Sequence, residues 1–314
     1  MKQVMAKRMA LKVAALAAGV MLAGSASAQA QAQGTTVRIV TNAGLLDIHL
    51  TDQATPATVT NFLKYVRNGA YDGVLFHRID KSPFVIQGGG YGYTESSTPR
   101  MRRMPEDPAI SNEFSASRPN VRGAVAMAKG NGANTATNQW YINLADNTAL
   151  DNTSNNGGYT VFGHVSAPSR SLLDAFAAMT SVDARNCTKT LLTSATDLGQ
   201  LPLRKPLTPV ACASITEENV VLMHTARVLP AATTLSDTDR VLNYLEALYP
   251  QFIAPASPAT QTADGYTYRS YPGTQAHVGS KDGVVYYLVP AISAEIKTLG
   301  PLAELLQQAA AAGY

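Results

Sequence analysis

The chain has 314 residues, of which 46% are hydrophobic and 15% are charged. This length predicts about two domains, each long enough to bury a core, and the composition excludes general disorder. Two cysteines are too few for a disulfide scaffold, and five histidines are too few for a metal-storage protein. The formal charge of +3 comes from the N-terminus, because four of the 25 basic residues and none of the 22 acidic residues lie within residues 1–28. The remaining chain carries a net charge of −1, which gives no indication of nucleic-acid binding.

Residues 1–28 have the pattern of a secretory signal peptide. A basic start leads into an apolar run from Leu11 to Leu22, and small residues follow up to Ala28. The run is about a dozen residues, whereas a membrane-spanning helix needs roughly 20, so we expect cleavage; a retained membrane anchor is the alternative. The cleavage site is ambiguous among Ala28, Ala30 and Ala32. The sequence therefore predicts a periplasmic or secreted protein whose mature chain has no membrane span.

The two cysteines leave two alternatives open. In an oxidising compartment, Cys187 and Cys212 could form a disulfide that closes a loop of about two dozen residues and stabilises the fold by roughly 3 kcal/mol. Otherwise they are two unpaired buried thiols. The sequence does not decide between a disulfide and free thiols.

From Thr35 to Val228 the pattern is mainly that of short strands. Alternating apolar residues predict a β-hairpin over 37–50 that turns at Asn42-Ala43-Gly44, and Thr55-Pro56 then begins a helix that ends at Gly69. Residues 71–165 alternate short strands with loops, a second helix is predicted at Ser169–Met179, and a last strand at Val220–Val228. Many strands with only two helices predict a mainly β fold, a closed antiparallel barrel capped by two helices.

The composition changes after the barrel. Residues 229–235 resemble a linker, and residues 236–314 predict a small α+β module of about 80 residues. This module has a helix that begins after Ser236, two strands at Tyr266–Tyr271 and Val284–Val289 that each follow an Asp-Gly pair, and a final helix from about Gly300. Eight of the 14 tyrosines lie after residue 235. These tyrosines either form the core of the module or provide a binding face for a partner or a cell-wall glycan.

Five blocks of sequence, which occur in a fixed order, carry the functional signal. They are Phe76-His77-Arg78-Ile79, Phe84-Val85-Ile86-Gln87-Gly88-Gly89-Gly90, Arg122-Gly123-Ala124-Val125-Ala126-Met127-Ala128, Asn138-Gln139-Trp140-Tyr141-Ile142-Asn143 and Val161-Phe162-Gly163. Over residues 35–228 the chain closely resembles the cyclophilin-type peptidyl-prolyl cis–trans isomerases, particularly their bacterial exported branch. The resemblance implies a cyclophilin-like barrel that acts on proline-containing exported polypeptides and needs no cofactor and no metal. It implies no nucleic-acid partner.

The resemblance also implies a site made of a cation beside an apolar pocket. It assigns catalytic roles to Arg78, Gln87 and Phe84: the arginine, which stays charged and offers several fixed donors, would stabilise the pyramidal imide nitrogen, and the glutamine would orient it. The positions matched to substrate binding are Val85, Ala128, Lys129, Asn138, Tyr141, Ala149, Leu150 and Tyr159.

The sequence departs from the family pattern at several of these positions. One extra residue separates Arg78 from Phe84, which could move the arginine relative to the pocket, and Lys129 replaces a familiar asparagine. Ala149 stands where many members have a large ring associated with cyclosporin, so the resemblance implies weak binding of that inhibitor. Tyr141 adds a hydroxyl to the usual phenylalanine, and this group needs a partner.

Two hypotheses compete with a simple isomerase. In the first, these departures abolish turnover, and the barrel is a proline-segment-binding chaperone or adaptor. In the second, the C-terminal module binds an unidentified partner and determines where the protein is located.

Overall fold

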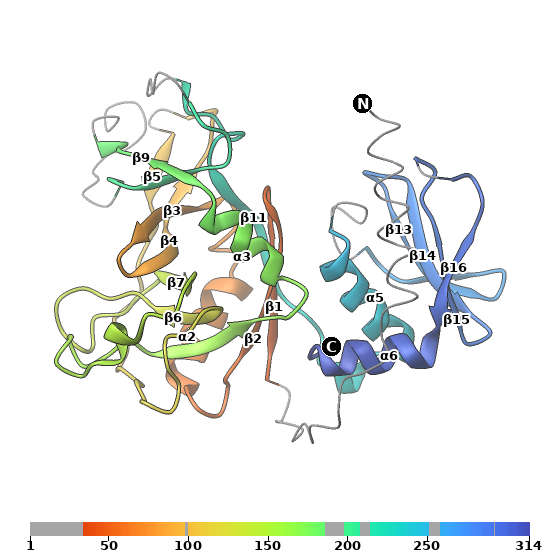
Figure 1. The fold of residues 1–314 in the computed structure, drawn as a ribbon, viewed down its shortest axis with the longest axis horizontal. Helices are drawn as coiled ribbons and strands as arrows, with labels where there is room; N and C mark the ends of the chain where they lie inside the picture. Colours follow the sequence, from red (N-terminus) through yellow and green to blue (C-terminus); the bar gives the residue numbers. More distant parts are fainter. Residues whose placement is uncertain (1–33, 98–99, 186–197, 208–213, 251–257, 292) are drawn as a thin grey trace.

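The computed structural model describes residues 34–97, 100–185, 198–207, 214–250, 258–291 and 293–314 (Figure 1). The predicted signal peptide, Cys187 and Cys212 lie outside these residues. Within them, no helix is long and apolar enough to cross a membrane.

Eight antiparallel strands close into the predicted barrel. They are β1 (Thr36–Thr41), β2 (Gly44–Leu50), β3 (Val74–Lys81), β4 (Phe84–Tyr93), β6 (Ala124–Met127), β7 (Trp140–Asn143), β8 (Val161–Val165) and β11 (Val221–Val228). Their order is β3-β11-β1-β2-β8-β6-β7-β4, and pairing of β3 with β4 closes the ring. The short strand β5 (Met101–Arg103) extends β4. The expected fold, a mainly β barrel, is therefore confirmed.

Two helices cover the barrel, as the apolar spacing predicts. Helix α2 (Pro56–Arg67) starts with proline at its first turn and buries Val59, Phe62, Leu63 and Val66. Phe62 meets Trp140 edge to face, with ring centroids 5.7 Å apart, at the centre of the main core. Helix α3 (Arg170–Ala177) is slightly shorter than predicted and buries Leu172, Leu173 and Phe176.

An additional layer lies between α3 and β11 in the chain. Strands β9 (Thr180–Val182) and β10 (Leu201–Leu203) pair with each other. Leu201 of β10 and the nearby Leu198 form a second apolar cluster with Leu75 of β3 and with Tyr91 and Tyr93 of β4. This layer brings residues near 200 alongside β3, which matters for the site described below.

The C-terminal module is an antiparallel sheet of five strands with two helices. Its strands are adjacent in chain order: β12 (Gln261–Ala263), β13 (Tyr266–Tyr271), β14 (Ala276–Lys281), β15 (Val284–Leu288) and β16 (Lys297–Pro301). Helices α5 (Asp237–Leu248) and α6 (Leu302–Ala311) lie on the side of the sheet that faces the barrel (Figure 1). The Ser236 hydroxyl accepts a hydrogen bond from the Asp239 amide (3.1 Å), which caps α5 as predicted.

The tyrosines of the module fall into a buried set and a half-buried set. Tyr244, Tyr271 and Tyr314 are buried in its core. Four others are only half-buried and line a groove of about 300 Å³ on the sheet; they are Tyr266, Tyr268, Tyr286 and Tyr287.

A buried network of charged groups joins the module to the barrel. Arg38 of β1 pairs with Asp47 of β2 (2.7 Å) and, across 208 positions of sequence, with Glu246 of α5. Glu246 also accepts a hydrogen bond from Arg269 of β13 (2.9 Å), and the Tyr314 hydroxyl donates to Asp47. The predicted linker begins inside this contact, because the Leu229 amide donates to the Thr36 carbonyl (2.9 Å) and the Leu229 side chain is buried in the core of the module.

Candidate active site

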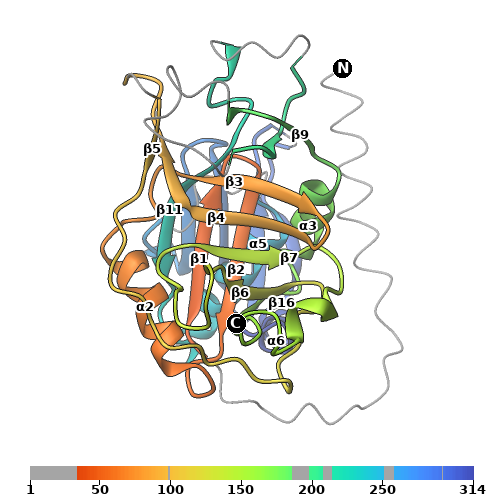
Figure 2. The ribbon, with the colours of Figure 1, turned by 90° about the vertical axis from the view of Figure 1, so that its left-hand side faces the viewer.

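A cavity of about 1010 Å³ lies on the barrel wall formed by β3, β4 and β7. Figure 2 views the barrel from this side, away from the module, with these strands in front. The lining includes eight of the predicted site residues, namely Arg78, Val85, Gln87, Ala128, Lys129, Tyr141, Leu150 and Tyr159. Residues far apart in sequence thus meet around one hollow.

Arg78 is held at the cavity by three side chains. Its Nη1 donates to Gln87 Oε1 on the facing strand (3.4 Å), its Nε donates to Gln200 Oε1 (3.3 Å), and its Nη2 pairs with Asp80. Gln87 is itself held, because its Nε2 donates to Gln139 Oε1 (2.8 Å). The Arg78 side chain remains 38% exposed, so it is fixed in place and still open to a ligand.

The extra residue between Arg78 and Phe84 does not remove the arginine from the cavity. Strands β3 and β4 pair in register from Arg78 opposite Gln87 to Lys81 opposite Phe84. The chain turns at Ser82-Pro83, so the additional residue is accommodated within the hairpin.

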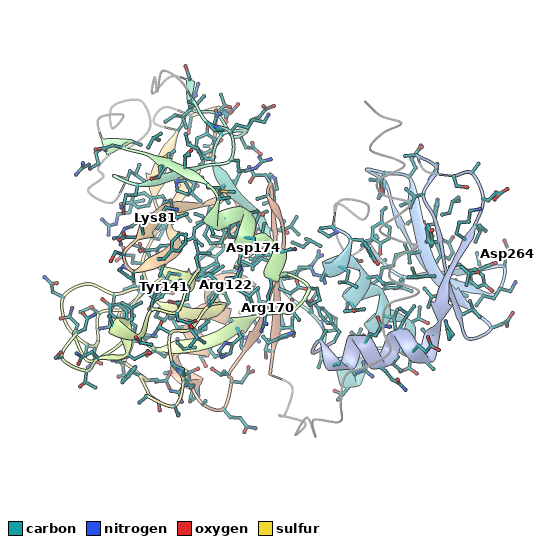
Figure 3. The ribbon with its side chains drawn as sticks, in the orientation of Figure 1. Lys81, Arg122, Tyr141, Arg170, Asp174 and Asp264 are labelled. Carbon is teal, nitrogen blue, oxygen red and sulfur yellow. The ribbon has the colours of Figure 1, made fainter. Side chains whose placement is uncertain are left out.

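The floor of the cavity is apolar. It is formed by Val85 and Leu150, both buried, with the ring of Tyr141. The Tyr159 ring lies 6.1 Å from that of Tyr141, nearly perpendicular to it. Figure 3 shows Tyr141 within the barrel, far from Asp264 of the module.

The additional hydroxyl of Tyr141 has a buried partner. It donates to Asn120 Oδ1 (2.8 Å), and Asn120 in turn accepts from Asn143 Nδ2 (3.1 Å) and donates to Asp151 Oδ1 (2.7 Å). Burial raises the pKa of Tyr141 well above its usual value. The hydroxyl is therefore a neutral anchor that points away from the apolar floor.

Three predicted site residues do not line the cavity. Phe84 packs against the main core, because alternation along β4 places Val85 and Gln87 on the cavity side and Phe84 with Ile86 on the other. Asn138 is buried and its Nδ2 donates to the Pro105 carbonyl (3.1 Å). Ala149 is exposed on the short 3-10 helix Thr148–Asp151.

Among the residues that sequence reasoning left out, four support the predicted site residues or extend the cavity lining. Gln139 and Asn120 support Gln87 and Tyr141, and Gln200 and Arg185 contribute lining from the additional β9–β10 layer. Gln139 directly follows Asn138, so the residue predicted from this motif is the sequence neighbour of the one that lines the cavity. Gln200 gives no local signal, because its contact with Arg78 spans 122 positions.

The comparisons with known proteins agree with this geometry. Residues 36–196 match the family model described as cyclophilin type peptidyl-prolyl cis-trans isomerase/CLD. This chain belongs to the cyclophilin family.

Curated relatives of this cyclophilin are isomerases by name. Peptidyl-prolyl cis-trans isomerase A of Dickeya dadantii (strain 3937) is 36% identical over 49% of this chain and 77% of the relative. Peptidyl-prolyl cis-trans isomerase cyp18 of Streptomyces antibioticus is 44% identical over 41% of this chain and 76% of the relative. A solved cyclophilin-type isomerase of Cryptosporidium parvum aligns with a TM-score of 0.40 and 20% identity, over 62% of this chain and 98% of the other. The predicted enzyme class is confirmed at the level of the family.

Proposed function

We propose that this cyclophilin accelerates cis–trans rotation about X-Pro bonds in exported proteins as they fold. Rotation of a peptide bond has a barrier of about 18–20 kcal/mol, because the nitrogen shares its lone pair with the carbonyl. At proline the two isomers are close in energy, yet they exchange in tens to hundreds of seconds. A catalyst therefore needs no covalent step; it has to bind the twisted imide more tightly than either planar form.

The observation that carries this proposal is the position of Arg78 beside the apolar floor. A proline ring packed on Val85, Tyr141 and Leu150 would place its imide nitrogen near the guanidinium. A permanently charged donor in a partly desolvated hollow stabilises a nitrogen whose lone pair has left resonance. Gln87 accepts a hydrogen bond from Arg78 Nη1, and this bond keeps the guanidinium oriented toward the cavity.

The cellular setting and the domain limits belong to the same proposal. We assign residues 1–28 to a signal peptide, 35–228 to the isomerase domain and 236–314 to a module that binds a partner, with a periplasmic or secreted location. The sequence pattern of the first 28 residues supports the export step. The half-buried tyrosines of the groove support a binding role for the module.

The test measures the rate at which the mature protein isomerises an Ala-Pro peptide, with NMR exchange spectroscopy as the method. We expect Arg78→Ala to reduce kcat/KM by about 100-fold or more, because it removes the donor that acts on the transition state. Arg122→Ala is the matched control, since Arg122 pairs with Asp174 (2.5 Å) and does not line the cavity. Equal rates for wild type and Arg78→Ala would contradict the proposal.

The ion pair between Arg78 and Asp80 supports the alternative, a proline-segment-binding chaperone with little turnover. If Asp80 holds the guanidinium away from the imide, Asp80→Asn should raise kcat while the affinity for peptide changes little. If Asp80 only positions Arg78, the same change should lower kcat. The direction of this change therefore separates the two functions.

A further inference from the structure

The charges around the cavity are compensated unequally. Among the described residues, the lining contains four cations, Arg78, Arg103, Lys129 and Arg185, and one carboxylate, Glu106. Each arginine has a carboxylate partner: Asp80 for Arg78, Glu106 for Arg103 (3.2 Å) and Asp183 for Arg185 (2.5 Å). Within the described part of the chain, Lys129 forms no such ion pair. The uncompensated positive charge of the cavity is therefore at Lys129.

The Lys129 ammonium is held next to the apolar floor. Its Nζ donates to the Asn156 carbonyl (2.5 Å) and lies 4.3 Å from the centre of the Tyr159 ring, which in turn packs against Tyr141. An ammonium has three donors, so the bond to Asn156 leaves capacity for a ligand. Burial lowers the pKa of Lys129, as expected for an ammonium that is partly removed from water without a counter-ion.

The neighbouring backbone places this charge at one edge of the cavity. Lys129 follows Ala128, whose amide donates to the Gln139 carbonyl (3.0 Å) at the end of β6 and β7. The strip formed by Ala128 and Lys129 thus runs along the cavity between Gln139 and Tyr159. A proline ring packed on the floor would bring the residue that precedes proline next to this strip, and the proposal below assumes that placement.

We propose that Lys129 gives the site a preference for peptides with aspartate or glutamate immediately before proline. A carboxylate at that position supplies the counter-ion that Lys129 lacks, and a lysine or arginine there is repelled. This inference rests on the proposed isomerase function and adds to it the chemical class of the substrate.

The experiment uses three peptides that differ only before proline: Glu-Pro, Ala-Pro and Lys-Pro. NMR exchange avoids a coupling protease, which would have a preference of its own. For wild type we expect kcat/KM to be about two- to fivefold higher for Glu-Pro than for Lys-Pro, the size of effect that one partly exposed charge pair gives. The ratio should decrease as salt is raised to about 0.5 M.

Variants of Lys129 make this preference attributable to one side chain. Lys129→Met should bring the Glu-Pro to Lys-Pro ratio to about one, and Lys129→Glu should invert it. Lys205→Met is the matched control, because Lys205 is exposed, pairs with Glu218 (2.5 Å) and lies outside the cavity lining. It should keep the wild-type ratio.

Two results would overturn the inference in distinguishable ways. If wild type isomerises the peptides but Lys129→Glu leaves the ratio unchanged, the preference is wrong and the isomerase proposal stands. If wild type isomerises none of them, the isomerase proposal fails. The preference is then tested by peptide titration. Tighter binding of Glu-Pro than of Lys-Pro by wild type, inverted in Lys129→Glu, supports the preference. Equal binding of the two peptides by wild type overturns it.

Discussion

Gln200 fixes Arg78 from a segment beyond the residues that match the family model. Its side chain accepts from Arg78 Nε (3.3 Å), and its backbone carbonyl accepts from the Ile79 amide (2.8 Å). We therefore expect Gln200→Met to lower kcat about threefold, the effect of losing one long hydrogen bond to a charged group, with KM little changed. The measurement is NMR exchange on the Ala-Pro peptide.

A double-mutant cycle separates positioning of Arg78 from a general structural effect. In an Arg78→Ala background, Gln200→Met should cause no further loss of kcat. An equal loss with and without Arg78 would mean that Gln200 acts on the fold and not on the arginine.

The Tyr141 hydroxyl provides a second test at a single atom. Because it donates to Asn120 and points away from the floor, Tyr141→Phe should lower the free energy of unfolding by about 1 kcal/mol and leave turnover close to wild type. Urea denaturation and the peptide assay measure the two quantities. Tyr159→Phe, at a half-buried position, should cost less stability. A large loss of turnover without loss of stability would show that the hydroxyl acts on the substrate.

Among the strands, β4 contains a glycine that packs closely against the neighbouring backbone. Gly89 has φ +94°, and a Cβ there would lie 2.4 Å from the Asn138 carbonyl oxygen. Gly283, between β14 and β15, also has a positive φ, +75°, but its Cβ would meet nothing within 4 Å. Comparing alanine substitutions at these two glycines separates the cost of backbone strain from the cost of steric overlap.

We predict that Gly89→Ala destabilises the protein more than Gly283→Ala. The second change costs about 1 kcal/mol for the left-handed backbone alone, and the first adds about 1–3 kcal/mol for the collision. Urea denaturation of both variants checks this difference. Equal losses would mean that β4 can shift away from Asn138 without cost.

Elements determined by neighbouring residues could be predicted from the sequence. The β1–β2 hairpin, the start of α2 at Pro56 and the Asp-Gly turns before β13 and β15 all follow from local backbone preferences. Strands β12, β14 and β16 do not follow from the sequence, because strands with few large apolar residues are defined by their partners in the sheet.

The same division holds for the candidate site. The motif residues that line the cavity were predictable from the resemblance, whereas the side to which Phe84 points follows from the register of β4. The support from Gln200 and the Arg38 pair with Glu246 depend on contacts across more than 100 positions, which no local pattern encodes.

For the whole molecule, Glu246 is the residue on which the contact between module and barrel depends. It is fully buried and pairs with Arg38 of the barrel and Arg269 of the module. Glu246→Gln should lower the free energy of unfolding by about 3–5 kcal/mol, because two buried arginines each lose one of their two carboxylate partners, Arg38 keeping Asp47 and Arg269 keeping Asp239. Glu295→Gln breaks an exposed pair with Lys297 and should cost at most about 1 kcal/mol. Similar costs in urea denaturation would contradict the buried network.

The pH dependence of stability involves two histidines on adjacent barrel strands. Burial lowers the pKa of His49, whose Nε2 donates to the Ala312 carbonyl (3.0 Å), and also lowers that of His164, paired opposite it. The unfolded chain therefore binds protons more readily than the folded one. The free energy of unfolding is not reduced by these histidines above their ordinary pKa of 6.5, and it falls as the pH decreases through that value.

We expect lower urea midpoints at about pH 5.5 than at about pH 7.5, and a smaller decrease in the double variant His49→Gln with His164→Gln. His224→Gln, at an exposed position, is the control and should keep the wild-type decrease. A decrease that is the same in the double variant would assign the acid sensitivity to other groups.

The buried ion network also limits how this C-terminal module could be grafted onto another barrel. A recipient without an arginine and an aspartate at the places of Arg38 and Asp47 would deprive Glu246 of one cation and would leave the Tyr314 hydroxyl with its longer hydrogen bond to Ser166 Oγ (3.3 Å). Transplanting the module therefore requires carrying two barrel residues with it, and natural exchange between relatives should show positions 38, 47 and 246 changing together.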